Sequence, residues 1–156
     1  MKSKIYVGIV LVIVILVVAG WFWFSKDTGE AIADDSMKVT VYKSPSCGCC
    51  VNYIALLRGE GYDVEVIETE DMTKIKQQYG VPREMESCHT SIFGDYVVEG
   101  HMPFEVITKM LEEQPDIKGI ALPNMPAGSP GMPGAKREPF TVYTLNDNST
   151  SIYLIY

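Results

Sequence analysis

The first pattern along the chain is an uninterrupted apolar run of twenty residues, 5–24, without a charged side chain. At about 1.5 Å per residue, a helix of that length spans the roughly 30 Å hydrocarbon core of a bilayer. Lys2 and Lys4 precede the run, which predicts a cytoplasmic N-terminus by the positive-inside rule. We therefore expect a transmembrane helix within residues 1–25, which anchors the rest of the chain to the membrane and places it outside the cytoplasm.

A cleaved signal peptide is the alternative, because Ala31-Ile32-Ala33 has the A-x-A pattern of a cleavage site. This pattern lies several polar residues beyond an apolar run that is long for a signal peptide, so we favour the uncleaved anchor. The anchored domain would lie in the periplasm or at the cell surface, and the cleaved one would be secreted. Asn148-Ser149-Thr150 fits an N-glycosylation acceptor, a triplet that often arises by chance.

Beyond a small, polar stretch at 26–37 that predicts a linker, polarity follows the periods of strands and helices in turn. We expect one folded domain over 38–156. Its expected elements, in chain order, are a strand 38–42, a helix 49–58, a strand 62–67, a helix 72–79, strands 90–93 and 96–98, a helix 103–113, and a hairpin of 140–145 with 152–156.

This order, β-α-β-α-β-β-α, predicts an α/β fold of layered sheet and helices. A cysteine cluster follows the first predicted strand directly, at the start of the first helix, where Val51, Ile54, Ala55 and Leu57 recur at helical spacing. The order is the thioredoxin-like one, and C-x-x-C at that position is the redox motif of such folds. We therefore expect a thioredoxin-like domain with an N-terminal transmembrane helix and a C-terminal β-hairpin.

Composition excludes several function classes. The chain of 156 residues has a net charge of −7, and the part after residue 33 carries −8, which argues against a nucleic-acid partner. Two histidines and no paired-carboxylate motif argue against a triad hydrolase or a glycosidase. The 123 residues after residue 33 can bury a core, so the four cysteines are not required as staples.

Three of the four cysteines, Cys47, Cys49 and Cys50, lie within four residues, and Cys88 follows 38 residues later. A helix N-terminus favours thiolates, and three crowded thiolates repel one another unless a cation lies among them. Thiolates select Cu(I), whereas structural zinc usually takes a second ligand pair that this chain lacks. We therefore expect these four cysteines to hold copper as Cu(I), with sulfur able to bridge several ions. An Fe–S cluster fits the ligand count but is less expected in an exported domain.

Two other interpretations of the cysteines stay open. Four cysteines can form two structural disulfides in an oxidising compartment. The chain can also be a thiol–disulfide oxidoreductase in which Cys47 is the nucleophile and Cys50 the resolving thiol, which leaves Cys49 and Cys88 without a role.

Both histidines lie near expected site residues in the sequence. His89 adjoins Cys88 just before a predicted strand, but neighbouring side chains of an extended segment point to opposite sides, which argues against both facing one metal. His101 lies between a predicted strand and helix, and we include it as a candidate ligand although turn histidines are commonly solvated. Met102 beside it more often serves packing.

Two methionines, Met125 and Met132, lie in a segment rich in proline and glycine, 122–139, which predicts a loop that covers another part of the domain. A loop stiffened by proline can hold thioethers over a site at little ordering cost, and thioethers suit Cu(I). We include both as candidate copper ligands; the alternative is a loop packed by its own apolar side chains.

Four motifs occur in a familiar order: Cys47-Gly48-Cys49-Cys50, Cys88-His89-Thr90, Glu99-Gly100-His101-Met102-Pro103, and the stretch from Met125 to Met132. Together they resemble the CopG-like copper-resistance family, long catalogued as a domain of unknown function, over roughly 38–145. The resemblance implies a thioredoxin-like domain outside the cytoplasm that binds copper through the C-x-C-C cysteines and the distant one. It also implies a role in copper tolerance, by holding copper, passing it to other copper-handling proteins outside the cytoplasm, or interconverting Cu(I) and Cu(II) as an oxidoreductase.

Overall fold

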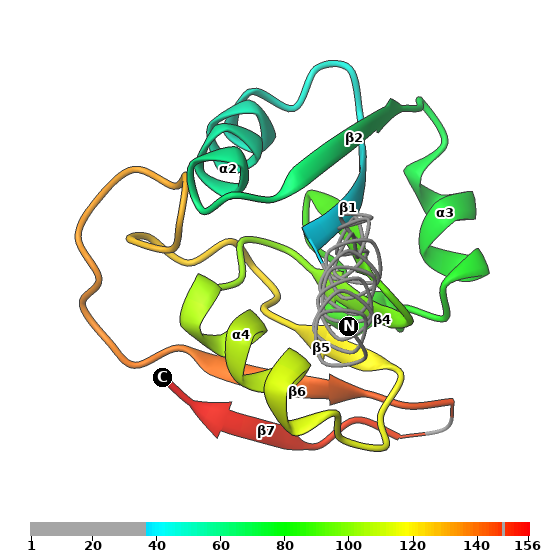
Figure 1. Ribbon diagram of the computed structural model, residues 1–156, viewed down its shortest axis with the longest axis vertical. Helices are drawn as coiled ribbons and strands as arrows, with labels where there is room; N and C mark the ends of the chain where they lie inside the picture. The colour runs from blue at the N-terminus through cyan, green and yellow to red at the C-terminus, as the bar shows by residue number, and fades with distance from the viewer. Residues whose placement is uncertain (1–36, 148) are drawn as a thin grey trace, which may run out of the picture. The chain divides into compact units, whose positions relative to one another are not determined.

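The computed structural model of the chain describes residues 37–147 and 149–156 (Figure 1). The predicted anchor, nearly all of the predicted linker, and Asn148 of the glycosylation triplet lie outside these residues. Within the described part, no helix has the length and apolar character needed to cross a bilayer.

A mixed sheet of seven strands, in the order β2-β1-β3-β4-β5-β6-β7, forms the centre of the described part (Figure 1). The strand β1 pairs in parallel with β2 and antiparallel with β3, and β4 pairs antiparallel with β3 and in parallel with β5. The elements are β1 (Lys38–Lys43), α2 (Gly48–Gly59), β2 (Asp63–Glu68), α3 (Met72–Gln78), the 3₁₀ helix η2 (Arg83–Met85), β3 (His89–Phe93), β4 (Tyr96–Glu99), α4 (Phe104–Glu113), β5 (Gly119–Ala121), β6 (Thr141–Leu145) and β7 (Ile152–Ile155).

The two faces of the sheet carry different helices. The larger core packs α2 and α4 against one face, and a smaller cluster, which includes Val81 and Met85, covers the other face beside α3. The neighbours Val97 and Val98 on β4 point to opposite faces, Val98 into the larger core and Val97 into the smaller cluster, as the period of a strand requires.

The predicted order of strands and helices is confirmed, including the antiparallel C-terminal hairpin of β6 and β7. The sequence did not predict β5, which has only three residues, all of them buried. A short strand that is buried on both faces lacks the alternation of polar and apolar positions that signals a strand.

The predicted buried face of the first helix was partly wrong. Cys50, Tyr53, Ile54 and Leu57 are the buried residues of α2, whereas Val51 is 56% exposed. The buried stripe therefore starts at a cysteine and runs through a tyrosine, neither of which belongs to the apolar pattern of the sequence.

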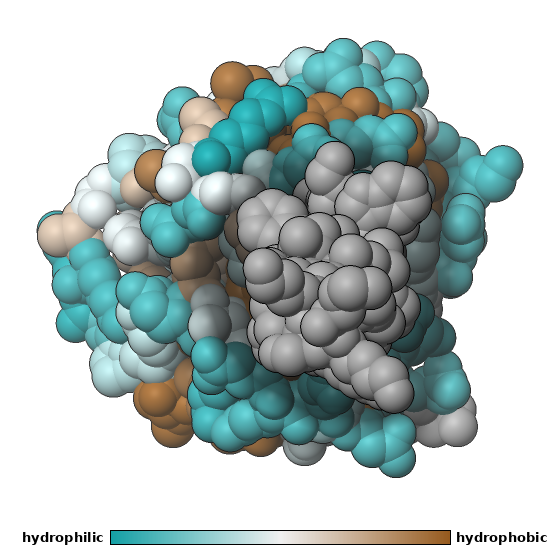
Figure 2. Space-filling model, viewed as in Figure 1, coloured by the Kyte–Doolittle hydropathy of each residue, from teal (hydrophilic) through white to brown (hydrophobic). Residues whose placement is uncertain are grey.

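The surface seen in Figure 2 is mostly hydrophilic, with smaller hydrophobic areas between the hydrophilic ones.

Replacing Gly119 with alanine should destabilise the domain by roughly 1–3 kcal/mol or more, the usual range for overpacking. A Cβ there would lie 1.9 Å from the backbone oxygen of Val97, so β5 would have to separate from β4. Urea unfolding of the full-length chain measures the loss. Gly59→Ala is the control, because no heavy atom lies within 4 Å of its added Cβ. Equal stability of the two variants would contradict this packing.

Candidate metal site

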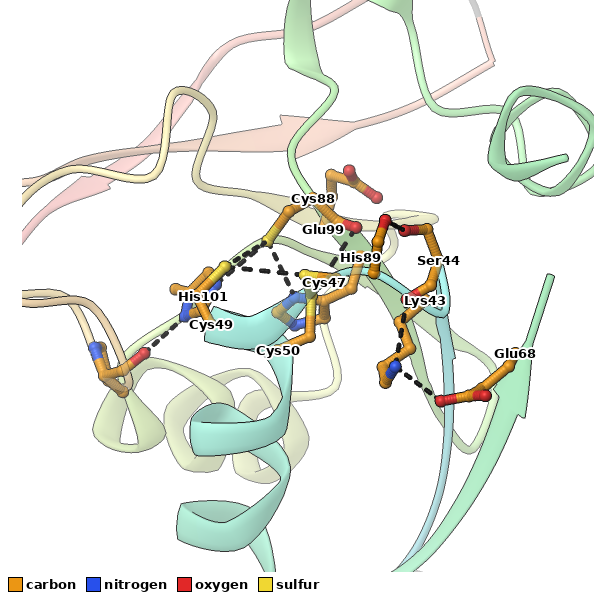
Figure 3. The surroundings of a disulfide bond; sticks show 12 residues. Lys43, Ser44, Cys47, Cys49, Cys50, Glu68, Cys88, His89, Glu99 and His101 are labelled. Atoms are coloured by element: carbon orange, nitrogen blue, oxygen red, sulfur yellow. Dashed lines mark hydrogen bonds and ion pairs between the residues drawn. A yellow bond between two sulfur atoms is a disulfide. The ribbon is translucent and has the colours of Figure 1, made fainter. Parts of the chain in front are cut away.

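Strand pairing brings three distant segments of the chain to one edge of the sheet. Lys43 at the end of β1 is opposite His89 at the start of β3, and Thr90 is opposite Glu99 at the end of β4. The cysteine cluster follows β1, Cys88 precedes β3, and His101 follows β4. Figure 3 shows their side chains pointing toward one another at the N-terminal end of α2.

The three clustered cysteines lie at the start of α2, where Cys47 is the N-cap residue. Cys47 and Cys50 form a disulfide, and Cys49 and Cys88 remain free thiols. The sulfur of Cys49 lies 3.6 Å from that of Cys47 and 3.9 Å from that of Cys88. All four sulfurs lie within 4.8 Å of one another, so the structure brings together the four cysteines that the sequence singled out.

Both histidines adjoin the same thiol. The Sγ of Cys88 lies 3.1 Å from Nε2 of His101 and 3.4 Å from Nδ1 of His89. The expectation that Cys88 and His89 point apart was wrong, because β3 begins at His89 and Cys88 lies in the bend before it, where strand alternation does not apply. Cys50, Cys88, His89 and His101 form a second group of metal-ligating atoms within 4.8 Å of one another.

The proline-rich loop orients His101. The Nδ1–H of His101 donates to the backbone oxygen of Pro130 at 2.6 Å, which leaves Nε2 as the acceptor nitrogen that faces Cys88. A Cβ on the next residue, Gly131, would lie 2.8 Å from the backbone nitrogen of Tyr53, so the loop packs closely against α2. A backbone carbonyl that fixes the tautomer is a common support for a metal-binding histidine.

Burial favours the neutral forms of Cys88, His89 and His101. It raises the pKa of the Cys88 thiol to about 12, with a further contribution from the neighbouring Cys49. It also lowers the pKa of His89 well below its ordinary value, helped by His101 and Lys76, and lowers that of His101. Neutral imidazoles are the form that binds metals, and a metal ion would displace the thiol proton.

The donor set fits a soft or borderline metal ion. Sulfur and imidazole donors suit copper and zinc, whereas hard ions prefer oxygen. Among the described residues, Nε2 of the fully buried His89 has no hydrogen-bond partner. A buried polar atom of this kind is unsatisfied, and a bound metal ion could satisfy it. A metal ion in this cluster would therefore find sulfur and nitrogen donors already gathered.

Tyr53 supports both imidazoles, a role that nothing in the sequence indicates beyond its place three residues after Cys50. Its ring lies 4.7 Å from that of His89 and 5.2 Å from that of His101, centroid to centroid. Its hydroxyl donates to the backbone oxygen of Met102 at 3.1 Å. Met102 itself is fully buried in the larger core, in agreement with the packing role expected for it.

Met125 and Met132 of the proline-rich loop are not among the residues that contact the cysteine–histidine cluster in the interactions described above. Met132 lines a surface hollow with Asn52 and Leu56 of α2. Met125 is partly buried and has a positive φ of 46°. The part of the loop that reaches the site is the backbone of Pro130 and Gly131, and a ligand role for the two thioethers stays a prediction.

Comparison with known proteins identifies relatives of this chain. A family described as a protein of unknown function, DUF411, matches residues 85–132. Two solved structures described as copper resistance protein CopG, form 1 and form 2, are each 37% identical with a TM-score of 0.69. The match covers 76% of this chain and 96% and 97% of the two others. No protein of curated function matches it.

The metal-free, disulfide-bonded chain should alkylate slowly at Cys88. A pKa of about 12 in place of an ordinary value near 9 lowers the thiolate fraction at neutral pH about a thousandfold. Iodoacetamide labelling followed by mass spectrometry should show a Cys88 rate that keeps rising between pH 7 and pH 10. In Cys49→Ser, the loss of the neighbouring thiol should speed the reaction. A Cys88 rate at pH 7 equal to that of a free cysteine would contradict the assigned burial.

Proposed function

Because the chain belongs to the CopG-like copper-resistance family, we propose that its cysteine–histidine cluster binds copper in a thioredoxin-like domain outside the cytoplasm. The observation that carries the proposal is the convergence of four sulfurs and two imidazoles from three separate segments of the chain. Each of the two four-residue groups has its donor atoms within 4.8 Å of one another, and they share Cys50 and Cys88.

Cu(I) is the oxidation state that the sulfur-rich part of the site favours, because soft thiolates select it. In the reduced chain, Cys47, Cys49, Cys50 and Cys88 supply four thiolates for one or more Cu(I) ions. His101 adds a nitrogen donor, and the loop with Met125 and Met132 covers the site. His89 is a further candidate, since one of its ring nitrogens belongs to the second group.

The disulfide between Cys47 and Cys50 supports a role in interconverting copper oxidation states. When these two thiols are oxidised, the donors that remain are two thiols and two imidazoles, a mixed set that suits Cu(II) better than four thiolates do. Oxidation of the dithiol releases two electrons and two protons, which balances the reduction of two Cu(II) ions to Cu(I). The reduced chain would thus supply the electrons, and the oxidised chain would be left with two thiols to hold the Cu(I) so formed.

The proposed location follows from the apolar run at 5–24 and from the disulfide, which persists in oxidising compartments. A copper site there would serve tolerance by sequestering the metal or passing it to other copper-handling proteins. Membrane attachment through a helix predicted at 5–24 would confine this activity to the membrane surface.

A thiol–disulfide oxidoreductase is the second candidate, because the structure forms the Cys47–Cys50 disulfide at the N-terminus of α2. That position favours a reactive thiolate on the attacking cysteine. Cys49, Cys88 and both histidines have no role in this chemistry. The copper proposal accounts for them and is therefore the better one.

Anaerobic titration of the reduced full-length chain with Cu(I), against a competing chelator, tests the copper proposal. We expect tight binding of at least one ion per chain by elemental analysis. The triple variant Cys47→Ser, Cys49→Ser, Cys50→Ser should lose it because no thiolate of α2 remains, whereas Ser46→Ala should bind as the wild type does. A triple variant that binds as tightly as the wild type would overturn the proposal.

The pair Cys49→Ser and Cys88→Ser separates the two candidates, because it leaves the C-x-x-C pair intact. We expect the double variant to lose copper, as two sulfur donors are gone. Reduction of a model disulfide substrate, followed by thiol release, is the second readout. The oxidoreductase would be favoured by two results together. The wild-type chain would have to reduce this substrate, and the double variant would have to keep both this activity and its bound copper.

A further inference from the structure

A buried ion pair lies beneath the metal site, formed by Lys76 of α3 and Glu99 of β4. The side chains are 4% and 0% exposed, and Nζ of Lys76 donates to Oε1 of Glu99. The same carboxylate accepts from the backbone N–H of Ser87 at 2.6 Å and, through Oε2, from the hydroxyl of Thr90 at 2.6 Å. The hydroxyl of Thr90 also accepts from Lys76 at 3.4 Å. None of these four residues belongs to the ligand groups described above.

Ser87 and Thr90, which donate to the Glu99 carboxylate, lie next to the candidate metal ligands in the sequence. Ser87 directly precedes Cys88, and Thr90 directly follows His89. Glu99 comes two residues before His101. One carboxylate therefore ties down the segment that supplies Cys88 and His89 at both of its ends, and holds it to the strand that leads into His101.

The ion pair acts through the sheet, from the face opposite the imidazoles. Thr90 and His89 are neighbours on β3, so their side chains point to opposite faces. His89 packs on Tyr53 of α2, and Thr90 meets Lys76 of α3.

Gly100, between Glu99 and His101, allows this segment to lie close to Ser87 and Leu122. Its N–H donates to the backbone oxygen of His89 at 3.1 Å, and its φ is 84°. A Cβ there would lie 2.5 Å from the backbone oxygen of Leu122 and 2.7 Å from Oγ of Ser87. Glycine is therefore required for the close approach of the segments that carry Cys88 and His101.

Stability alone does not account for a buried ion pair in this place. Apolar replacement of both partners of such a pair is often neutral or stabilising, because burying two charges is costly. A pair whose hydrogen bonds end on the residues that flank the ligands has a second use, since partners of this kind orient metal ligands.

We propose that Lys76 and Glu99 are positioning residues that hold Cys88, His89 and His101 in a metal-binding arrangement before the metal enters. The proposal rests on the proposed copper function for its role, but the arrangement itself exists in the metal-free chain. The ion pair touches neither the sulfurs nor the imidazoles. Its hydrogen bonds reach the site through the backbone of Ser87 and the side chain of Thr90, and the charge of Lys76 also helps to lower the pKa of His89 and so to keep it neutral.

The test removes both charges together, in Lys76→Met with Glu99→Leu, so that no single buried charge is left unpaired. Val98→Ala is the control, since Val98 is the fully buried neighbour of Glu99 and points into the opposite core. Two readouts are measured on the full-length chain. One is Cu(I) affinity by chelator competition on the reduced protein, and the other is the alkylation rate of Cys88 in the metal-free, disulfide-bonded protein.

We expect the double variant to bind the same number of Cu(I) ions with about 10- to 100-fold lower affinity, the usual effect of losing such support. Its Cys88 should alkylate several-fold faster than in the wild type, because the segment is released. Val98→Ala should lower stability but leave both readouts unchanged. Wild-type affinity and alkylation in the folded double variant would overturn the proposal.

Two further outcomes are covered by the same design. If the double variant does not fold, Thr90→Val takes its place, because it removes one hydrogen bond to the carboxylate at nearly constant volume, and the same two readouts decide. If the wild-type chain binds no Cu(I), the copper function fails, and the alkylation rate of Cys88 alone decides whether the ion pair positions this segment.

Discussion

The antiparallel pairing of β3 with β1 on one side and β4 on the other is the constraint on which the site depends. Its register sets the end of β1, the start of β3 and the end of β4 at one edge of the sheet. The residues that follow or precede these ends are Cys47, Cys88 and His101. A shift of one residue in the pairing would turn His89 to the face of α3, away from Tyr53 and the cysteines at the start of α2. The chemistry is therefore specified by backbone hydrogen bonds that lie outside the site.

Burial then determines the charge state of what this register gathers. A thiol and two imidazoles lie together, and burial shifts the pKa of each toward its neutral form. These three neutral groups do not repel one another in the metal-free chain. A bound cation would stabilise the deprotonated thiol and so favour the thiolate. Forming the Cys47–Cys50 disulfide lowers the number of available thiols from four to two, so the oxidation state of the chain changes the donor set.

Much of the domain follows from the sequence, because β1, α2 and the β3–β4 hairpin have clear periods. The strand β5 does not follow from the sequence, because its three residues are all buried and show no alternation of polar and apolar positions. Residue chemistry alone singles out the four cysteines and His101, which the structure brings together. Strand alternation argues against His89, but β3 begins only at His89 and the rule does not extend back to Cys88. Tyr53 and the Lys76–Glu99 pair were missed, since a lysine and a glutamate 23 residues apart carry no local signal of their pairing across the fold.

X-ray absorption at the copper K-edge tests the central claim most directly, because it counts the atoms bound to the metal. The sample is the reduced full-length chain loaded with one equivalent of Cu(I), with His101→Ala as its partner. We expect a Cu(I) edge and a first shell dominated by sulfur in both samples, with imidazole scattering that is weaker in the variant. A first shell of nitrogen and oxygen alone would contradict the assignment of copper to the cysteine–histidine cluster.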